Sequence, residues 1–85
     1  MNPYDLNVIE HQRIFIVQAI DYYTRQINNR REILVQLKMH GGGDLMNLER
    51  NINFMQYMVN QYQQMLECLR QMWYVYINQG VQMPN

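Results

Sequence analysis

The sequence predicts an all-α protein: a coiled-coil-like, antiparallel two-helix hairpin that dimerises into a four-helix bundle. Apolar residues recur at alternating three- and four-residue spacing through two long stretches. Three consecutive glycines, Gly41 to Gly43, separate these stretches, which have nearly equal length. A second apolar row accompanies each stretch. The 85 residues suit a single domain, which we divide into a helix over 3–40, a loop over 41–43, a helix over 44–79 and a short flexible tail over 80–85.

The first helix is expected to begin at Pro3, because proline suits the first helical position and Asn2 can cap the helix in front of it. Asp5 then lies in the first turn, where a negative charge is favourable. The apolar seam of this helix is interrupted only by Arg13 and Arg30. It contains Leu6, Ile9, Ile16, Ile20, Tyr23, Ile27, Leu34 and Leu37.

The second helix shows the strongest pattern in the chain, since all ten of its seam positions are apolar. They are Leu45, Leu48, Ile52, Met55, Val59, Tyr62, Leu66, Leu69, Trp73 and Tyr76. We expect Asp44 to cap this helix at its start and Gly80 to end it. The glycine loop before it can adopt left-handed backbone conformations without steric cost.

Oppositely charged residues suggest a register for the hairpin. If the chain reverses at Gly42, facing residues should have numbers that sum to about 80 to 84, and five pairs of opposite charge have numbers that sum to 80 or 82. They are Glu10–Arg70, Arg13–Glu67, Arg31–Glu49, Glu32–Arg50 and Lys38–Asp44. Each exposed pair would contribute only about 0 to 1 kcal/mol, so the pairs would fix register more than stability. Asp21 and Arg25 are expected to pair within the first helix.

The second apolar rows make the helix faces too wide for one hairpin to bury. One row, Met58, Met65 and Met72, follows the second helix; the other, Val8, Phe15 and Tyr22, follows the first. A homodimer would cover both rows, and higher assemblies are possible because further apolar residues lie outside them. We expect the interface to contain Phe15, Tyr22, Met58, Met65, Met72, Trp73 and Tyr76. The alternative is a methionine-rich groove that captures a helix of another protein, since methionine repacks easily.

Composition excludes several classes of partner. The formal net charge is zero, so no excess of positive charge attracts nucleic acid. No apolar run approaches the roughly 18 residues that span a membrane, and no secretory signal is visible. The lone Cys68 cannot form an internal disulfide, which suits a reducing, intracellular (cytoplasmic) setting or a protein assembly. The 21 Asn and Gln residues outnumber the 14 charged ones, and weakly charged surfaces favour association.

Patterns of catalytic and metal-binding residues do not emerge. The Glu-x-x-His spacing of di-iron bundles is missing, and His11, Glu67 and Cys68 do not form a compact ligand set. We therefore expect no metal, no cofactor and no catalytic residue; Cys68 is interpreted as a small packing residue at an assembly surface.

One enzyme family shares a short pattern with this chain. Arg13 and Arg30 lie 17 residues apart, and the segment Arg30-Arg31-Glu32-Ile33 follows. Over residues 13–33 this resembles the first helix of the all-helical chorismate mutases, in which two arginines and a lysine hold an anionic substrate. The lysine position of that family falls at Gly41 here, and a third helix is missing. We therefore expect no enzyme activity.

A structural role is the functional hypothesis. The abundance of Tyr, Met, Gln and Asn is similar to that of bacterial spore-coat proteins. The ending from Tyr74-Val75-Tyr76 through Gly80 to Pro84 resembles one helical family among them, over some 12 residues. That resemblance implies a subunit that acts by packing against other helices.

Overall fold

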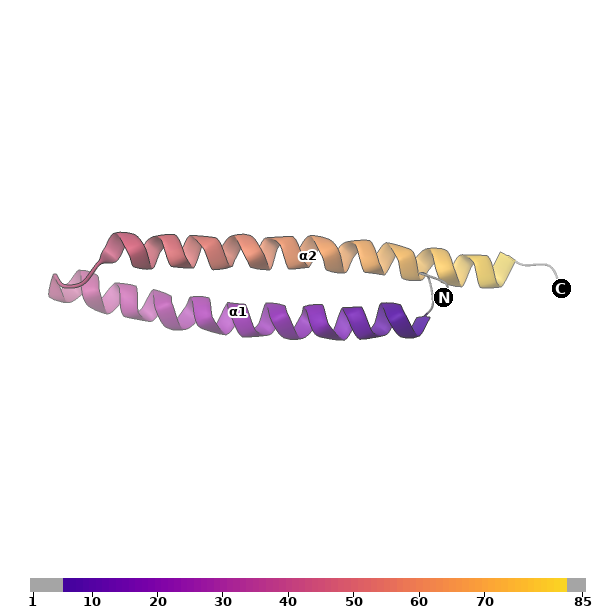
Figure 1. Ribbon diagram of the computed structural model, residues 1–85, viewed down its shortest axis with the longest axis horizontal. Helices are drawn as coiled ribbons and strands as arrows, with labels where there is room; N and C mark the ends of the chain where they lie inside the picture. Colours follow the sequence, from indigo (N-terminus) through magenta and orange to yellow (C-terminus); the bar gives the residue numbers. More distant parts are fainter. Residues whose placement is uncertain (1–5, 83–85) are drawn as a thin grey trace.

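The computed structural model describes residues 6–82 as two long helices that run antiparallel. Helix α1 spans Leu6–His40 and helix α2 spans Leu45–Gln82. They lie side by side, with the loop at one end and the start of α1 and the end of α2 at the other (Figure 1). The molecule measures 70 × 19 × 14 Å. The predicted all-helical hairpin is confirmed; the predicted Asn2 cap and the Pro3 start lie outside the described residues.

Helix α2 ends later than the sequence predicts. It continues to Gln82, so the prediction that Gly80 ends the helix is wrong. A glycine inside a helix costs about 1 kcal/mol relative to alanine, which is too little to stop a helix that is otherwise intact.

The loop uses its glycines as expected. Gly41 and Gly43 have φ angles of 68° and 82°, in the left-handed region that favours glycine. The Gly42 N–H donates to the Leu37 carbonyl oxygen at 3.2 Å, which closes α1 in a Schellman-type turn. A Cβ on Gly43 would lie 2.9 Å from Leu37 Cδ1. Both this close approach and the left-handed φ angle therefore disfavour a side chain at this position.

Asp44 starts α2 as a cap. Its Oδ1 accepts the backbone N–H of Asn47 at 3.1 Å, and its Oδ2 accepts the Asn47 side-chain amide at 2.6 Å. The carboxylate therefore satisfies one of the amide donors that every helix start leaves unpaired. This confirms the predicted cap.

The core is the predicted seam, in two clusters. The cluster nearer the loop contains Ile27, Ile52, Met55 and Val59 as buried residues. The cluster nearer the termini contains Ile9, Ile16 and Leu69. Seam residues such as Ile20, Tyr23, Tyr62 and Leu66 pack against these clusters while remaining partly exposed. The whole core of a two-helix hairpin is thus a single line of contact between α1 and α2.

Contacts between the two helices define the register of the hairpin. The Tyr23 and Tyr62 rings stack with centroids 6.2 Å apart and an interplanar angle of 15°. Lys38 Nζ lies 3.5 Å from Glu49 Oε1. The residue numbers in these two contacts sum to 85 and 87. Ile9 and Trp73, which line one pocket, sum to 82, and Phe15 and Met65, which line another, sum to 80. The helices therefore lie close to the predicted register, and the larger sums belong to long side chains, which lean toward the N-terminus of their own helix.

The five predicted cross-helix ion pairs do not form among the described residues. Glu10 binds Arg13 at 3.0 Å, and Glu67 binds Arg70 at 3.8 Å, both one turn apart on the same helix. A charged side chain reaches a partner on the adjacent turn without crossing to the other helix. Pairs within one helix therefore form in preference to these cross-helix pairs. The predicted local pair is confirmed: Asp21 lies 3.1 Å from Arg25. Exposed charges therefore follow local geometry, while apolar packing sets the register.

Candidate association surface

The hairpin has two different long sides. On one side polar groups bridge the helices: Lys38 pairs with Glu49, and Arg31 Nη2 donates to Gln56 Oε1 at 3.5 Å. Glu10 and Arg70 lie on this side as well, because they are whole multiples of seven residues from Arg31 and Gln56 on their own helices; both line a pocket beside the seam. We call this the polar side.

The other long side contains no charged residue of its own; the Arg30 guanidinium reaches its edge and donates to Gln26 Oε1 at 2.7 Å. Beside the seam, each helix presents a further series of residues at four- and three-residue spacing, and no Asp, Glu, Lys or Arg occurs in either series. We call these residues the charge-free face. In α1 they are Val8, Gln12, Phe15, Ala19, Tyr22, Gln26, Asn29, Ile33 and Gln36; in α2 they are Asn47, Asn51, Phe54, Met58, Gln61, Met65, Cys68, Met72 and Val75.

Contacts in the structure place both series on the same side of the hairpin. A pocket of about 530 Å³ is lined by Gln12 and Phe15 from α1 and by Met65 and Cys68 from α2. In an antiparallel helix pair, equivalent flanking positions of the two helices lie together, which explains this arrangement. The charge-free face is therefore one continuous surface across both helices.

Large apolar side chains on this face remain exposed in the single hairpin. Phe15 is 65 %, Phe54 61 %, Tyr22 56 % and Met65 51 % exposed. Such side chains are costly to leave in water when they gather on one surface.

The predicted interface residues divide between this face and the end of the seam. Phe15, Tyr22, Met58, Met65 and Met72 all lie on the charge-free face, with Met58 and Met72 half-buried against the seam. Trp73 and Tyr76 lie instead on the seam near the chain termini, at 36 % and 37 % exposure. The structure thus brings five of the seven predicted residues onto one surface. Whether any of them contacts a partner stays a prediction.

Sequence reasoning missed two apolar members of this surface, Phe54 and Val75. With the methionine row, Cys68 and Gln61 they form a second series at alternating four- and three-residue spacing, the same repeat as the main seam. Extension of this repeat along the second helix would have identified both residues from the sequence.

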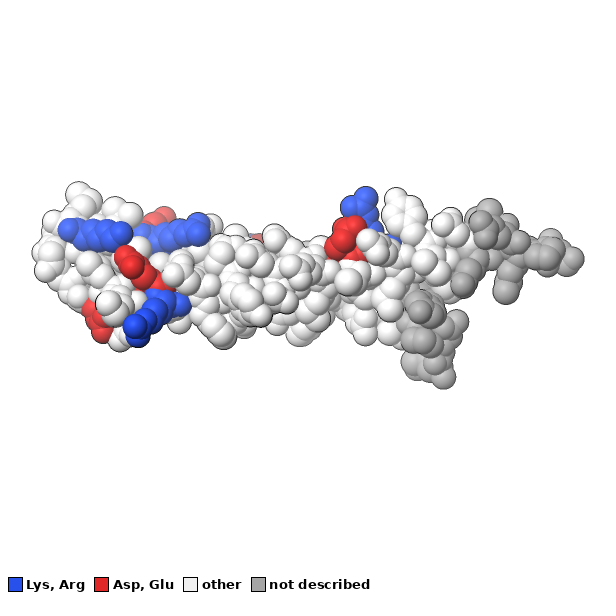
Figure 2. Space-filling view, turned by 90° about the horizontal axis from the view of Figure 1, so that it is seen from above, with Lys and Arg blue, Asp and Glu red and all other residues white. Residues whose placement is uncertain are grey.

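Long stretches of α2 lack charge. No charged residue occurs in α2 from Asn51 to Leu66. Figure 2 shows the consequence on one side of the molecule, where charged side chains gather near the loop end and in a second group, with an uncharged stretch between them. Electrostatic repulsion would therefore do little to keep another uncharged surface away from the middle of the hairpin.

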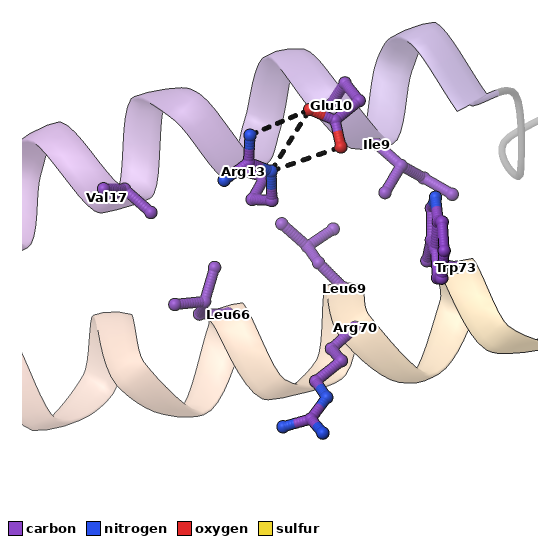
Figure 3. Close-up of a pocket in the computed structure, with 8 residues that line it drawn as sticks. All are labelled: Ile9, Glu10, Arg13, Val17, Leu66, Leu69, Arg70 and Trp73. Carbon is purple, nitrogen blue, oxygen red and sulfur yellow. Dashed lines mark hydrogen bonds and ion pairs between the residues drawn. The ribbon is translucent and has the colours of Figure 1, made fainter.

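The polar side has a smaller pocket of about 320 Å³, shown in Figure 3. Ile9, Leu69 and Trp73 form its apolar wall, and Trp73 lies across from Ile9. The Arg13 guanidinium bonds twice to Glu10 Oε2, at 3.1 and 3.0 Å. These hydrogen bonds, and then the attraction of the Glu10 charge, raise the pKa of Arg13 above its ordinary value. Arg70 extends away from α1 (Figure 3), so the pocket presents no unpaired cation to a ligand.

Residues considered for chemistry are satisfied locally. Arg30 Nη1 donates to Gln26 Oε1 at 2.7 Å, and the His11 Nδ1 lies 2.8 Å from the Asn7 carbonyl oxygen. Arg13 and Arg30 each have a partner on their own helix, so the structure does not bring them together as an anion-binding pair. In residues 6–82, no three His, Cys, Asp or Glu side chains are placed to hold a metal ion.

The helices were also compared with the requirements of a membrane span and with known proteins. Within the described part of the chain, neither helix is both long and apolar enough to cross a membrane. No protein-family model, curated protein or solved structure matches this chain.

Proposed function

We propose that this chain is a non-enzymatic structural subunit that associates with a second copy through the charge-free face to form a four-helix bundle. The observation that carries the proposal is the row of exposed apolar side chains on a surface that contains no Asp, Glu, Lys or Arg. Burial of such a surface gains hydrophobic free energy. The Arg30 guanidinium at its edge is already hydrogen-bonded to Gln26, whereas burial of unpaired charge is strongly unfavourable.

The exposed area supports a second copy as the partner. The chain exposes 6833 Å², whereas a compact protein of its 10.4 kDa mass would expose about 5400 Å². The difference, about 1400 Å², exceeds the roughly 800 Å² per partner of a standard interface. A dimer would therefore remove the excess with an interface of ordinary to large size.

The alternative is an adaptor that captures a helix of another protein in the same place. The observation that favours it is the 530 Å³ pocket between α1 and α2, lined by Phe15, Met65 and Cys68. An apolar side chain of a partner helix would fill it, as in other helix-in-groove complexes. Both functions use the charge-free face, and they differ in what occupies it.

Light scattering during size-exclusion chromatography tests the proposal directly. We expect a mass near twice the 10.4 kDa of the chain. Met65→Lys should shift the protein to monomer, because it places a charge in the interface. The matched control is Gln64→Lys, at the exposed neighbouring position off this face, which should leave the mass unchanged. A monomeric natural chain that orders only with a partner helix would favour the adaptor, and equal effects of the two lysines would contradict the assignment of the face.

A further inference from the structure

We propose that Met65 is a site of reversible oxidation by peroxides, and that its sulfoxide keeps the hairpin from dimerising. This inference rests on the proposed dimer and adds a way to regulate it. Met65 is the middle residue of the methionine row, between Met58 and Met72. Its oxidation would therefore change the interior of the proposed interface.

The methionines of α2 are concentrated on the charge-free face. Three of the five methionines in this helix lie there, at every seventh residue from Met58 to Met72. The seam beside them is aliphatic and aromatic, with Met55 as its one methionine. Leucine would fill a similar volume, so packing alone does not require a thioether in the row. What distinguishes methionine from leucine at these positions is the chemistry of its sulfur.

Met65 is accessible in the free hairpin and would be covered in the dimer. It is 51 % exposed, whereas Met58 and Met72 are half-buried against the seam. It also lines, with Phe15, the pocket of about 530 Å³, which is wide enough to admit hydrogen peroxide. A second copy on the charge-free face would close both approaches. Oxidation therefore acts on the free hairpin and opposes its association.

The reaction is an oxygen transfer from the peroxide to the thioether. The sulfur lone pair attacks one oxygen of hydrogen peroxide, an S–O bond forms as the O–O bond breaks, and the other oxygen leaves as water. The sulfur is oxidised to a sulfoxide and the peroxide is reduced. The sulfoxide is polar and accepts hydrogen bonds, so it disrupts interfaces rich in methionine. A methionine sulfoxide reductase reverses the step, because a dithiol takes up the oxidation as a disulfide and the oxygen leaves as water.

The sulfoxide should weaken association without unfolding the hairpin. Water satisfies its oxygen in the free hairpin, and burial of that oxygen without an equivalent donor is unfavourable. A symmetric dimer contains Met65 twice, so we expect its dissociation constant to rise at least about tenfold. The helices should persist, because the two buried clusters contain Met55 and not Met65.

Peroxide treatment of a Cys68→Ser variant tests this inference, since that variant removes the only thiol. Mass spectrometry of proteolytic peptides measures the sulfoxide at each methionine, and sedimentation equilibrium measures the dissociation constant. We expect hydrogen peroxide to convert dimer to monomer, and a sulfoxide reductase with dithiothreitol to restore the dimer. Met65→Leu in the same background should remain dimeric under the same treatment.

Two methionines outside the charge-free face provide the matched control. Met39 and Met46 are 72 % and 63 % exposed, so peroxide should oxidise them at least as readily as Met65. A variant with both Met39→Leu and Met46→Leu should still lose its dimer in peroxide, because neither residue belongs to the proposed interface.

The rate of oxidation at each methionine gives a second readout. Met65 should react more slowly when the protein concentration is far above the dissociation constant, because the free hairpin is then scarce. Met39 and Met46 should react at the same rate throughout. A dimer that survives complete oxidation of Met65, or a Met65→Leu variant that dissociates as its parent does, would overturn this regulatory site and leave the proposed function standing. A monomeric mass before oxidation would overturn both.

Discussion

Truncation of Phe54 should weaken the dimer strongly. A phenylalanine side chain buries roughly 150 to 250 Å² in a core, and the Phe54 side chain is 61 % exposed in the hairpin. About 120 Å² of ring therefore remains for a partner to cover, which at about 25 cal/mol per Å² corresponds to about 3 kcal/mol. Phe54→Ala removes two rings from a symmetric dimer. The loss of association free energy would therefore be about 6 kcal/mol if the dimer buries each ring fully, and about 3 kcal/mol if it buries half of each. The dissociation constant should rise by about 10² to 10⁴-fold.

Tyr57→Ala is the matched control for this prediction. Tyr57 is 59 % exposed and lies on the same helix, at the outward position of its turn rather than on the charge-free face. It therefore removes a similar aromatic area without touching the proposed interface. Sedimentation equilibrium measures both dissociation constants, and circular dichroism checks that each variant stays helical. If Tyr57→Ala weakens association as much as Phe54→Ala, the effect of a ring does not depend on its position. That result would refute the assignment of the interface to the charge-free face.

Three other predictions follow from the loop and from the absence of charge. Gly43→Ala should destabilise the fold by about 1 to 2 kcal/mol, because a left-handed φ is unfavourable for alanine and the new methyl group would collide with a leucine of α1. Gly42→Ala should be neutral or stabilise by up to about 1 kcal/mol; thermal melts at one protein concentration should show this order, and a reversed order would contradict the described loop. Asp44→Ala should cost about 1 kcal/mol through loss of the helix cap, whereas Asp44→Asn should cost much less. Association should change little when salt rises from about 0.05 to 0.5 M, because neither series of the face contains a charged residue; a steep loss of dimer in sedimentation would show that ion pairs hold it.

Much of the fold could be predicted because its causes are local. The buried residues Ile27, Ile52 and Val59 were identified by spacing alone, since a helix returns to the same face every three or four residues. The turn at Gly41 to Gly43 and the Asp44 cap were likewise local, because each depends on the backbone preferences of one residue and its nearest neighbours.

The partners of the charged residues could not be predicted from charge alone. Glu10 and Arg70 line one pocket, yet the carboxylate binds Arg13 on its own helix. Exposed ion pairs are worth so little that their choice of partner follows proximity and cannot align two helices. The alignment is set instead by how Tyr23, Tyr62 and their apolar neighbours pack, and that packing depends on shapes from both helices at once.

The charge-free face, like the fold, depends partly on local sequence and partly on tertiary packing. The sequence by itself determined that each helix carries more apolar residues than one seam needs, because helical periodicity assigns every residue to a side of its own helix. Only the tertiary structure decided that the second rows of α1 and α2 share one side of the hairpin, with the polar bridges on the other. The physical reason is that the side of a helix is a local property, whereas the meeting of two sides depends on how the helices turn and slide against each other.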